Sequence, residues 1–411
     1  MGHRSLLVVA GFVIGFFVGT FTLSTLDANH SRDEAPETSL ASISNWSLPH
    51  FTFEFEHGLK KMKCDRTGNN VGWHVRLSLF AAWKYKAQFR FPAEMCGIFA
   101  DLGGKVISFQ DEADRSHVDA REPVYPYHWR NFHPTERNPP WTGFWHDLVA
   151  ELSPSNRRTW LVAQSLVLNN VKPYLRVTET RLKLGYNDLV FHVRGGDIML
   201  EFGKGIHAGH RKGGYTSGPF RYMLANYFQP PLAVLLAVLQ QHRQVIAPET
   251  HFKIVVVTEN HKGNPVIAGL QERFGDQVVI QTSSLEEDQS LLLSAHHIAY
   301  GRSSFGYTYS LLSNATTVYG MMTLANRTLA APIAMQPVNP TQKVFTLHAP
   351  SYLEQLESQG GWQATPEQKK NMQTWDGEVQ IDCDAMDISR CEVVTRRWVN
   401  LLTSTPSHTD V

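Results

Sequence analysis

Between residues 188 and 319, short apolar runs alternate with stretches of helical periodicity, and this alternation restricts the folds open to the chain. The pattern predicts strands over 189–193, 252–258, 277–281 and 317–319. It predicts helices over 265–274, 286–297 and 306–312, and a long helix within 224–242 whose start Pro230 and Pro231 interrupt. Strands that alternate with helices in this way favour a parallel, doubly wound α/β sheet.

An earlier part of the chain has the same character on a smaller scale. A turn-rich loop at 68–72 precedes a predicted helix over 75–85, and strands are expected over 88–91 and 105–109. Another helix is expected over 159–172. Two α/β units suit a chain of 411 residues, which is long enough for two packed domains. The 38 basic residues equal the 38 acidic ones, so there is no basic excess to indicate nucleic-acid binding.

An uncharged apolar run, Leu6–Leu23, lies near the N-terminus. About 18 helical residues come close to the thickness of a bilayer core, so we expect a transmembrane signal-anchor over 6–23 behind a cytoplasmic tail of residues 1–5. Arg4 before the run and acidic residues after it favour a cytoplasmic N-terminus. A cleaved signal peptide is the alternative. Small residues recur at the spacing that lets two such helices form a homodimer, although ordinary membrane composition explains them equally well: Gly11, Gly15 and Gly19.

The next segment, 24–59, is rich in Ser, Thr, Asn and acids and is interpreted as a stem between membrane and globule. Either interpretation of the N-terminus places the rest of the chain in the secretory lumen. Four glycosylation sequons agree with that location, although burial would exclude the third from use: Asn29, Asn45, Asn314 and Asn326.

Four cysteines in a lumenal chain favour two disulfides. The short loop between Cys383 and Cys391 favours that pair, which leaves Cys64 with Cys96. The other two connectivities and four free thiols remain open.

The first chemical motif is His192-Val193-Arg194-Gly195-Gly196-Asp197, directly after a predicted buried strand. Ligands of open α/β sheets bind at the carboxyl ends of strands. The glycines allow close backbone approach there, and an arginine can grip a diphosphate with two hydrogen bonds. Asp197 can hold Arg194 or cap the next turn of the chain. A strand-end turn with an ordinary surface arginine explains the motif equally well.

The second motif runs from Asp288 to Phe305. A helix carries a carboxylate at its start, and Ser303-Ser304 open a later helix. Hydroxyl and backbone N–H groups at a helix N-terminus suit phosphate oxygens. The simpler interpretation is a serine N-cap.

Together the two motifs resemble the fucosyltransferase superfamily that uses GDP-fucose, which includes the α1,2-, α1,6- and protein O-fucosyltransferases. The hallmark is a strand ending in His-x-Arg, and later a carboxylate about one helix before a Ser/Thr-Ser turn. The loop at Asn69-Asn70 resembles the Gly-Asn loop of the family's first motif, and the stretch around Phe305 resembles plant cell-wall fucosyltransferases. The likeness covers roughly residues 62–345 and departs at Gly195, where many members carry a second arginine. The matching residues are His192, Arg194, Asp197, Asp288, Ser303 and Ser304.

The resemblance implies a GT-B fold, in which two Rossmann-like domains face a cleft. Residues 60–185 would form the acceptor domain and 186–345 the domain that binds the GDP-sugar, with a C-terminal extension over 346–411. It implies a Golgi type II membrane enzyme that transfers fucose with inversion from GDP-fucose to a hydroxyl of a glycan or glycoprotein. No metal or other cofactor is expected, because Arg194 would stabilise the departing diphosphate. The one Asp-x-Asp, at 382–384, lies outside the α/β region.

Direct displacement needs a base for the acceptor proton, and Glu201 is the first candidate. Asp197, His207 and His210 are the alternatives. Aromatic residues of an irregular loop at 125–146 can stack on sugar faces, although packing under a proline-rich loop explains them as well. The candidates for acceptor binding are Tyr127, Trp129, Trp141 and Trp145.

Two other functions stay open. The same fold can use another GDP- or UDP-sugar. Alternatively, the chain is a non-catalytic lumenal protein that binds glycans or nucleotides, an interpretation that Gly195 in place of the second arginine leaves open.

Overall fold

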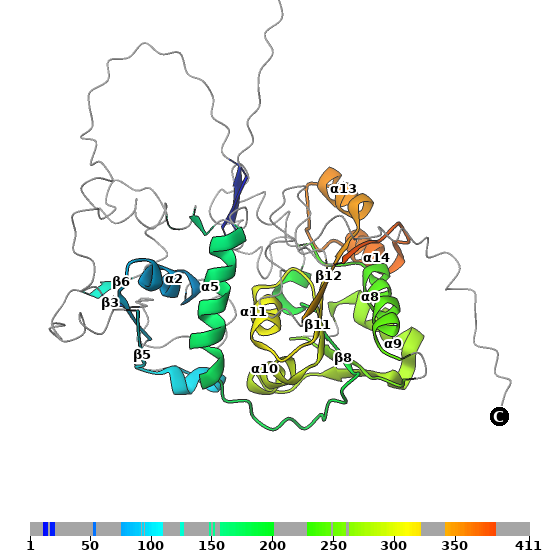
Figure 1. Cartoon of the computed structure of the whole chain (residues 1–411). Helices are drawn as coiled ribbons and strands as arrows, with labels where there is room; N and C mark the ends of the chain where they lie inside the picture. Colours follow the sequence, from blue (N-terminus) through cyan, green and yellow to red (C-terminus); the bar gives the residue numbers. More distant parts are fainter. Residues whose placement is uncertain are drawn as a thin grey trace, which may run out of the picture.

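The structure is a computed structural model, shown in Figure 1. It describes residues 75–91, 93, 95–109, 148, 151–152, 157–200, 228–247, 250–259, 263–321 and 342–383, together with four short strands at 11–14, 17–20, 52–54 and 124–126.

A seven-stranded, mostly parallel sheet organises the larger unit, and its strand order is β13-β12-β11-β10-β7-β8-β9. Only β13 runs antiparallel to its neighbour. This confirms the α/β class and the parallel sheet expected from the alternation in sequence. The strands are β7 (Leu189–His192), β8 (Ile254–Val257), β9 (Val278–Gln281), β10 (His297–Tyr300), β11 (Thr317–Met321), β12 (Lys343–His348) and β13 (Gln380–Cys383).

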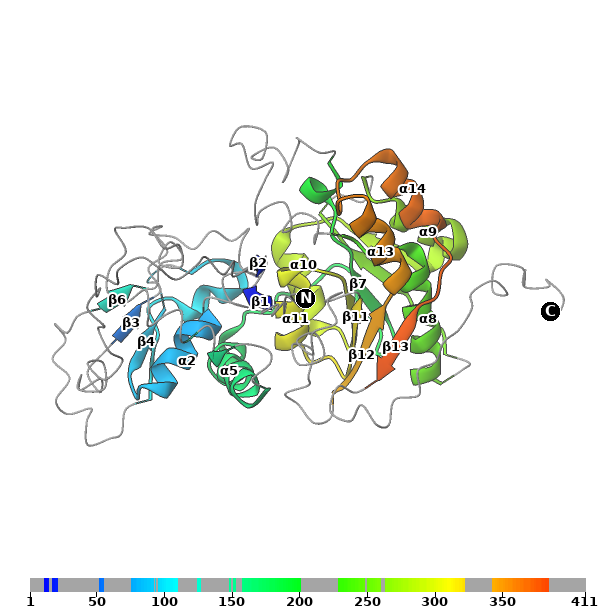
Figure 2. The same ribbon diagram turned by 90° about the horizontal axis from the view of Figure 1, so that it is seen from above.

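Helices cover both faces of this sheet, as Figure 2 shows from above. Side chains alternate along β7: Val190 belongs to the apolar cluster with α10 and α11, whereas Leu189 and Phe191 belong to the cluster with α8, α9 and α13. Two-sided burial explains why the strands are continuous apolar runs. The elements are η8 (Gly196–Met199), α8 (Leu232–Val245), α9 (Pro265–Phe274), η11 (Gly275–Gln277), α10 (Leu285–Ser294), α11 (Ser304–Leu312), α13 (Pro350–Ser358) and α14 (Pro366–Thr374).

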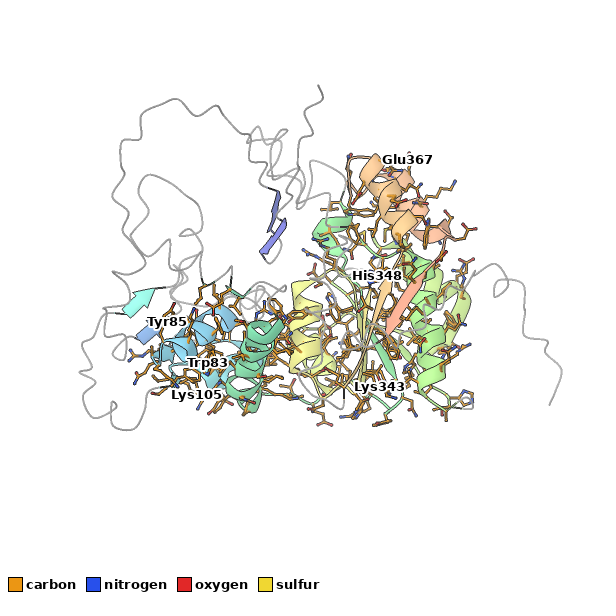
Figure 3. All side chains as sticks on the ribbon, turned by 45° about the horizontal axis from the view of Figure 1, so that its top comes forward. Trp83, Tyr85, Lys105, Lys343, His348 and Glu367 are labelled. Carbon is orange, nitrogen blue, oxygen red and sulfur yellow. The ribbon has the colours of Figure 1, made fainter. Side chains whose placement is uncertain are left out.

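A smaller unit precedes the large one and holds a four-stranded sheet in the order β5-β4-β3-β6. Strand β3 is parallel to β4 and β6, and β5 is antiparallel to β4. The elements are β3 (Thr52–Glu54), α2 (Arg76–Lys84), β4 (Gln88–Arg90), η5 (Gly97–Leu102), β5 (Val106–Ser108), β6 (Val124–Pro126), α5 (Arg157–Asn170) and η7 (Lys172–Tyr174). Figure 3 labels Trp83 and Tyr85 at the end of α2, and Lys343 and His348 at the two ends of β12.

The two units meet at α11, which lies beside α5 in Figures 1 and 2. The hydroxyl of Tyr307 accepts hydrogen bonds from Arg76 of α2 at 3.0 Å and from Gln164 of α5 at 2.6 Å. Lys172 donates to the carbonyl of Ser313 at 2.7 Å, just past the end of α11. The helix that follows the second motif is therefore held by both units.

Three segments differ from expectation. Residues 286–297 are predicted as one helix, but α10 ends at Ser294 and β10 begins at His297. The seven-stranded unit does not end at residue 345, where the C-terminal extension is expected to begin, because β12 and β13 pair within its sheet and α13 and α14 pack on it. In the same region, Trp362 is buried and donates a hydrogen bond to the carbonyl of Ile198 at 2.9 Å. Strand β3, inside the predicted stem, pairs with β4.

Within the predicted span 6–23, the structure describes two strands, β1 (Gly11–Ile14) and β2 (Phe17–Thr20), which pair antiparallel. Among the described residues, none of the helices has both the length and the apolar character needed to cross a bilayer.

Candidate functional site

The first motif and the Ser303-Ser304 part of the second motif follow two neighbouring strands, β7 and β10, at their carboxyl ends. Strand β7 pairs with β10 in parallel, so that His192 lies opposite Tyr300. If the strands are numbered along the chain with β7 as the first, their order across the sheet is 3-2-1-4-5-6-7. The direction in which successive strands are added therefore reverses between β7 and β10. Doubly wound sheets bind ligands at this reversal, outside the carboxyl ends of the strands. In Figure 3, His348 marks the same edge of the sheet, because β12 is parallel to β11.

His192 ends β7 in a buried position against α11. Its ring lies 5.2 Å from the ring of Phe305, and a Cβ added to Gly306 would lie 2.9 Å from Nδ1. Burial, and then the charge of Arg194, lowers the pKa of His192 to about 3. The imidazole is therefore neutral at physiological pH, and it packs against the start of α11.

The turn after His192 is anchored from α9. The side chain of Asn264 donates to the carbonyl of Arg194 at 3.0 Å, while its oxygen accepts from the backbone N–H of Val266 at 3.1 Å and caps α9. Arg194 itself is half-buried. Gly196 has a φ of +60°, in the left-handed region that favours glycine. One side chain thus fixes both the backbone at Arg194 and the neighbouring helix.

Ser303 begins α11 as its N-cap. Its hydroxyl oxygen accepts from the backbone N–H of Gly306 at 3.2 Å, and the side chain is buried. The simple capping interpretation is therefore correct for Ser303. A hydroxyl can donate while it accepts, so capping is compatible with binding a phosphate oxygen. Ser304 is the first residue of α11, directly before Phe305.

Asp288 lies in the first turn of α10, close to the end of β9. Burial raises the pKa of Asp288, and the negative charges of Glu287 and Glu259 raise it further, whereas a hydrogen bond with Gln281 lowers it. The resulting pKa is about 7. Its Oδ1 has no hydrogen-bond partner among the described residues. A carboxylate that is half protonated near neutral pH can either accept or donate a hydrogen bond.

Two further side chains lie at the carboxyl ends of these strands, and reasoning from the sequence does not identify them. Glu259 follows β8, and its Oε2 lies where a Cβ on Gly196 would approach to 2.5 Å. Arg302 follows β10, and its guanidinium lies over the ring of Phe228, 5.3 Å from the centroid. Glu259 is detectable as an acid directly after a predicted strand. Arg302 is not, because the sequence predicts no strand where β10 lies.

The remaining candidates are not placed. Nothing is described of the Asp197 side chain, although its backbone lies in η8. Outside the described residues lie the base candidates Glu201, His207 and His210, the loop residues Asn69 and Asn70, the aromatic residues Tyr127, Trp129, Trp141 and Trp145, the sequons Asn29, Asn45 and Asn326, and the cysteines Cys64 and Cys391.

The other predicted features have partial answers. Asn314 is exposed, so burial does not exclude its glycosylation. Cys96 is disulfide-bonded, and its pairing with Cys64 stays a prediction, as does that of Cys383 with Cys391. In the described part of the chain, His, Cys, Asp and Glu side chains do not gather in threes as a metal site would require.

The chain matches no protein-family model and no curated protein. A solved structure titled "Structure of the citrinin polyketide synthase CMeT domain" is 11% identical over 50% of this chain, with a TM-score of 0.16. The chain spans 41% of that protein. A likeness this weak carries no argument about fold or activity.

Proposed function

We propose that this protein is a nucleotide-sugar-dependent glycosyltransferase whose donor diphosphate binds where β7 and β10 end, and that the donor is GDP-fucose. One observation carries the proposal: the His192–Asp197 motif and the Ser303-Ser304 turn, about 100 residues apart in sequence, follow neighbouring parallel strands, with His192 opposite Tyr300. The fold in this proposal is GT-B, with the seven-stranded unit as donor domain. The acceptor is a hydroxyl of a glycan or glycoprotein, and the setting is the Golgi lumen behind an N-terminal anchor.

The chemistry of the edge suits the departing diphosphate. Arg194 supplies a permanent positive charge and a planar set of donors. The N-terminus of α11 adds backbone N–H groups and the favourable end of a helix dipole. Stabilising the leaving group in this way needs no metal ion, because the cations belong to the protein.

Glu259 suits the ribose of the nucleotide. In the dinucleotide-binding form of the doubly wound sheet, an acidic side chain downstream of the phosphate-binding turn accepts a hydrogen bond from a ribose hydroxyl. Strand β8 is second in order along the chain of this sheet, and Glu259 follows it beside Gly196. A diphosphate at Arg194 would therefore leave its ribose near a carboxylate that accepts hydrogen bonds.

The test is nucleotide binding followed by transfer. Isothermal titration of the purified full chain with GDP should show binding, and Arg194→Ala should weaken it by about tenfold to a hundredfold, as expected for a charge-assisted hydrogen bond. The same variant should lose transfer from GDP-fucose on a glycan array. An Arg194→Ala enzyme with normal activity would refute the assignment.

The alternatives have distinct outcomes. Hydrolysis or transfer with UDP-sugars alone keeps the fold and changes the donor. Binding of GDP without transfer from any nucleotide sugar identifies a non-catalytic nucleotide-binding protein, and the absence of any nucleotide binding removes the proposal altogether.

A further inference from the structure

We infer that Arg302 binds the donor diphosphate together with Arg194, so that each of two neighbouring strands supplies one arginine to the site. This inference rests on the proposed function, because it assumes a nucleotide diphosphate at this edge. The sequence alone assigns Arg302 no role.

The register of the sheet brings the two arginines together. His192 of β7 lies opposite Tyr300 of β10, and each strand leaves the sheet after that pair. Arg194 is the second residue after His192, and Arg302 is the second residue after Tyr300. Adjacent parallel strands lie about 4.8 Å apart, so two such residues begin within reach of one bound diphosphate.

The surroundings hold Arg302 at this edge. The guanidinium of Arg302 lies 5.3 Å from the ring centroid of Phe228, which is buried. Nearby, Pro230 packs on the same turn, because a Cβ on Gly301 would lie 3.2 Å from Pro230 Cδ. The contact with the ring fixes where the guanidinium lies, and a guanidinium is a planar set of donors that matches phosphate oxygens. A half-buried arginine held in this way loses less side-chain entropy when it binds a phosphate.

The charge of the ligand calls for a second cation. A nucleoside diphosphate that leaves a sugar carries about two negative charges, and Arg194 contributes one positive charge. Glu259 and Asp288 lie at the same edge and add negative potential. A second arginine on the neighbouring strand balances the diphosphate against these carboxylates.

The experiment compares binding of guanosine, GMP and GDP to the full chain by isothermal titration. The variants are Arg302→Ala, Arg302→Lys and Arg194→Ala, with Arg243→Ala as matched control. Arg243 is exposed in the last turn of α8, so its removal changes net charge equally. Arg302→Ala should weaken GDP binding by about tenfold to a hundredfold and leave guanosine binding unchanged. Arg302→Lys should recover part of the loss, because it keeps the charge without the planar donors.

Each other outcome has a defined meaning. If Arg194→Ala weakens GDP binding and Arg302→Ala does not, the inference is wrong and the proposed function stands. An equal loss in Arg302→Ala and Arg243→Ala also overturns the inference, since net charge then explains it. If the wild-type chain binds no nucleotide diphosphate, both fail. Should Arg302→Ala unfold, Arg302→Gln keeps most of the stem over Phe228, and a GDP affinity equal to wild type in that variant would overturn the inference.

Discussion

His297 makes folding stability depend on pH, at the end of the sheet opposite the candidate site. The side chain is 3% exposed at the start of β10, and neither ring nitrogen has a hydrogen-bond partner among the described residues. The ring of His242 lies 4.6 Å away and that of Tyr186 lies 5.9 Å away. Burial, and then the charges of His242 and His296, lowers the pKa of His297 to about 4.

The sign of the effect is set by proton binding. The unfolded chain takes up a proton on this histidine near pH 6.5, whereas the folded chain does so only near pH 4. Between those values the unfolded state binds more protons, so the free energy of unfolding falls as pH falls. Linkage between these two pKa values gives a loss of about 2 kcal/mol from pH 7 to pH 5. Below pH 4 both states are protonated and the contribution stops growing.

Phenylalanine in place of His297 tests this argument. His297→Phe keeps an aromatic ring against His242 and removes two buried polar atoms that lack partners among the described residues. Urea unfolding monitored by tryptophan fluorescence should show that the variant gains about 2 kcal/mol over wild type on going from pH 7 to pH 5. His251→Gln, at an exposed histidine, controls for the loss of one imidazole. Stability curves of His297→Phe and wild type that fall in parallel with pH would refute the reasoning.

Two further substitutions test the site itself. Gly306→Ala places a Cβ 2.7 Å from the Cβ of Tyr300 and 2.9 Å from Nδ1 of His192. The overpacking cost of about 1–3 kcal/mol should exceed the helix-propensity gain of roughly 1 kcal/mol, so the variant should be less stable than wild type. A variant that is more stable than wild type in urea unfolding would contradict this. Asp288→Asn should gain stability relative to wild type as pH rises from about 5.5 to about 8. The raised pKa of Asp288 makes the folded wild type lose a proton in this range that the unfolded chain has already released, so the wild type loses stability. If the difference in free energy of unfolding between variant and wild type, measured in urea, did not change with pH, this would be contradicted.

The elements that sequence predicts well carry their signals locally. Helix α9 spans Pro265–Phe274 as expected, because Asn264 caps it, proline lies in its first turn, and Gly275 ends it with a φ of +50°. Strand β7 is predicted because burial on both faces makes it a continuous apolar run. Helix α8 begins at Leu232, directly after the two prolines expected to interrupt the start of the helix within 224–242, because proline fits only at or before a first turn.

The elements that sequence misses depend on tertiary packing. Helix α10 ends at Ser294 with neither glycine nor proline to mark the boundary, and Ala295 already has extended dihedral angles. The four residues of β10 are buried because β7 and β11 flank them and helices cover both faces of the sheet. The packing of Trp362 against η8, which ties the chain after 345 to the sheet, has no local signature either.

The sequence predicts one helix over 286–297, where the structure has the end of α10 and the start of β10. This error also explains which residues of the candidate site can be identified from the sequence. If residues 286–297 form one helix, Arg302 has no strand before it and no relation to Arg194. Once β10 is in place beside β7, the same two-residue step from His192 and from Tyr300 leads to an arginine on each strand. The proposed diphosphate site, with cations on both sides of the reversal, therefore depends on strand register. Moving Arg302 by one residue, as an insertion after Tyr300 would, should then weaken GDP binding about as much as removing the side chain.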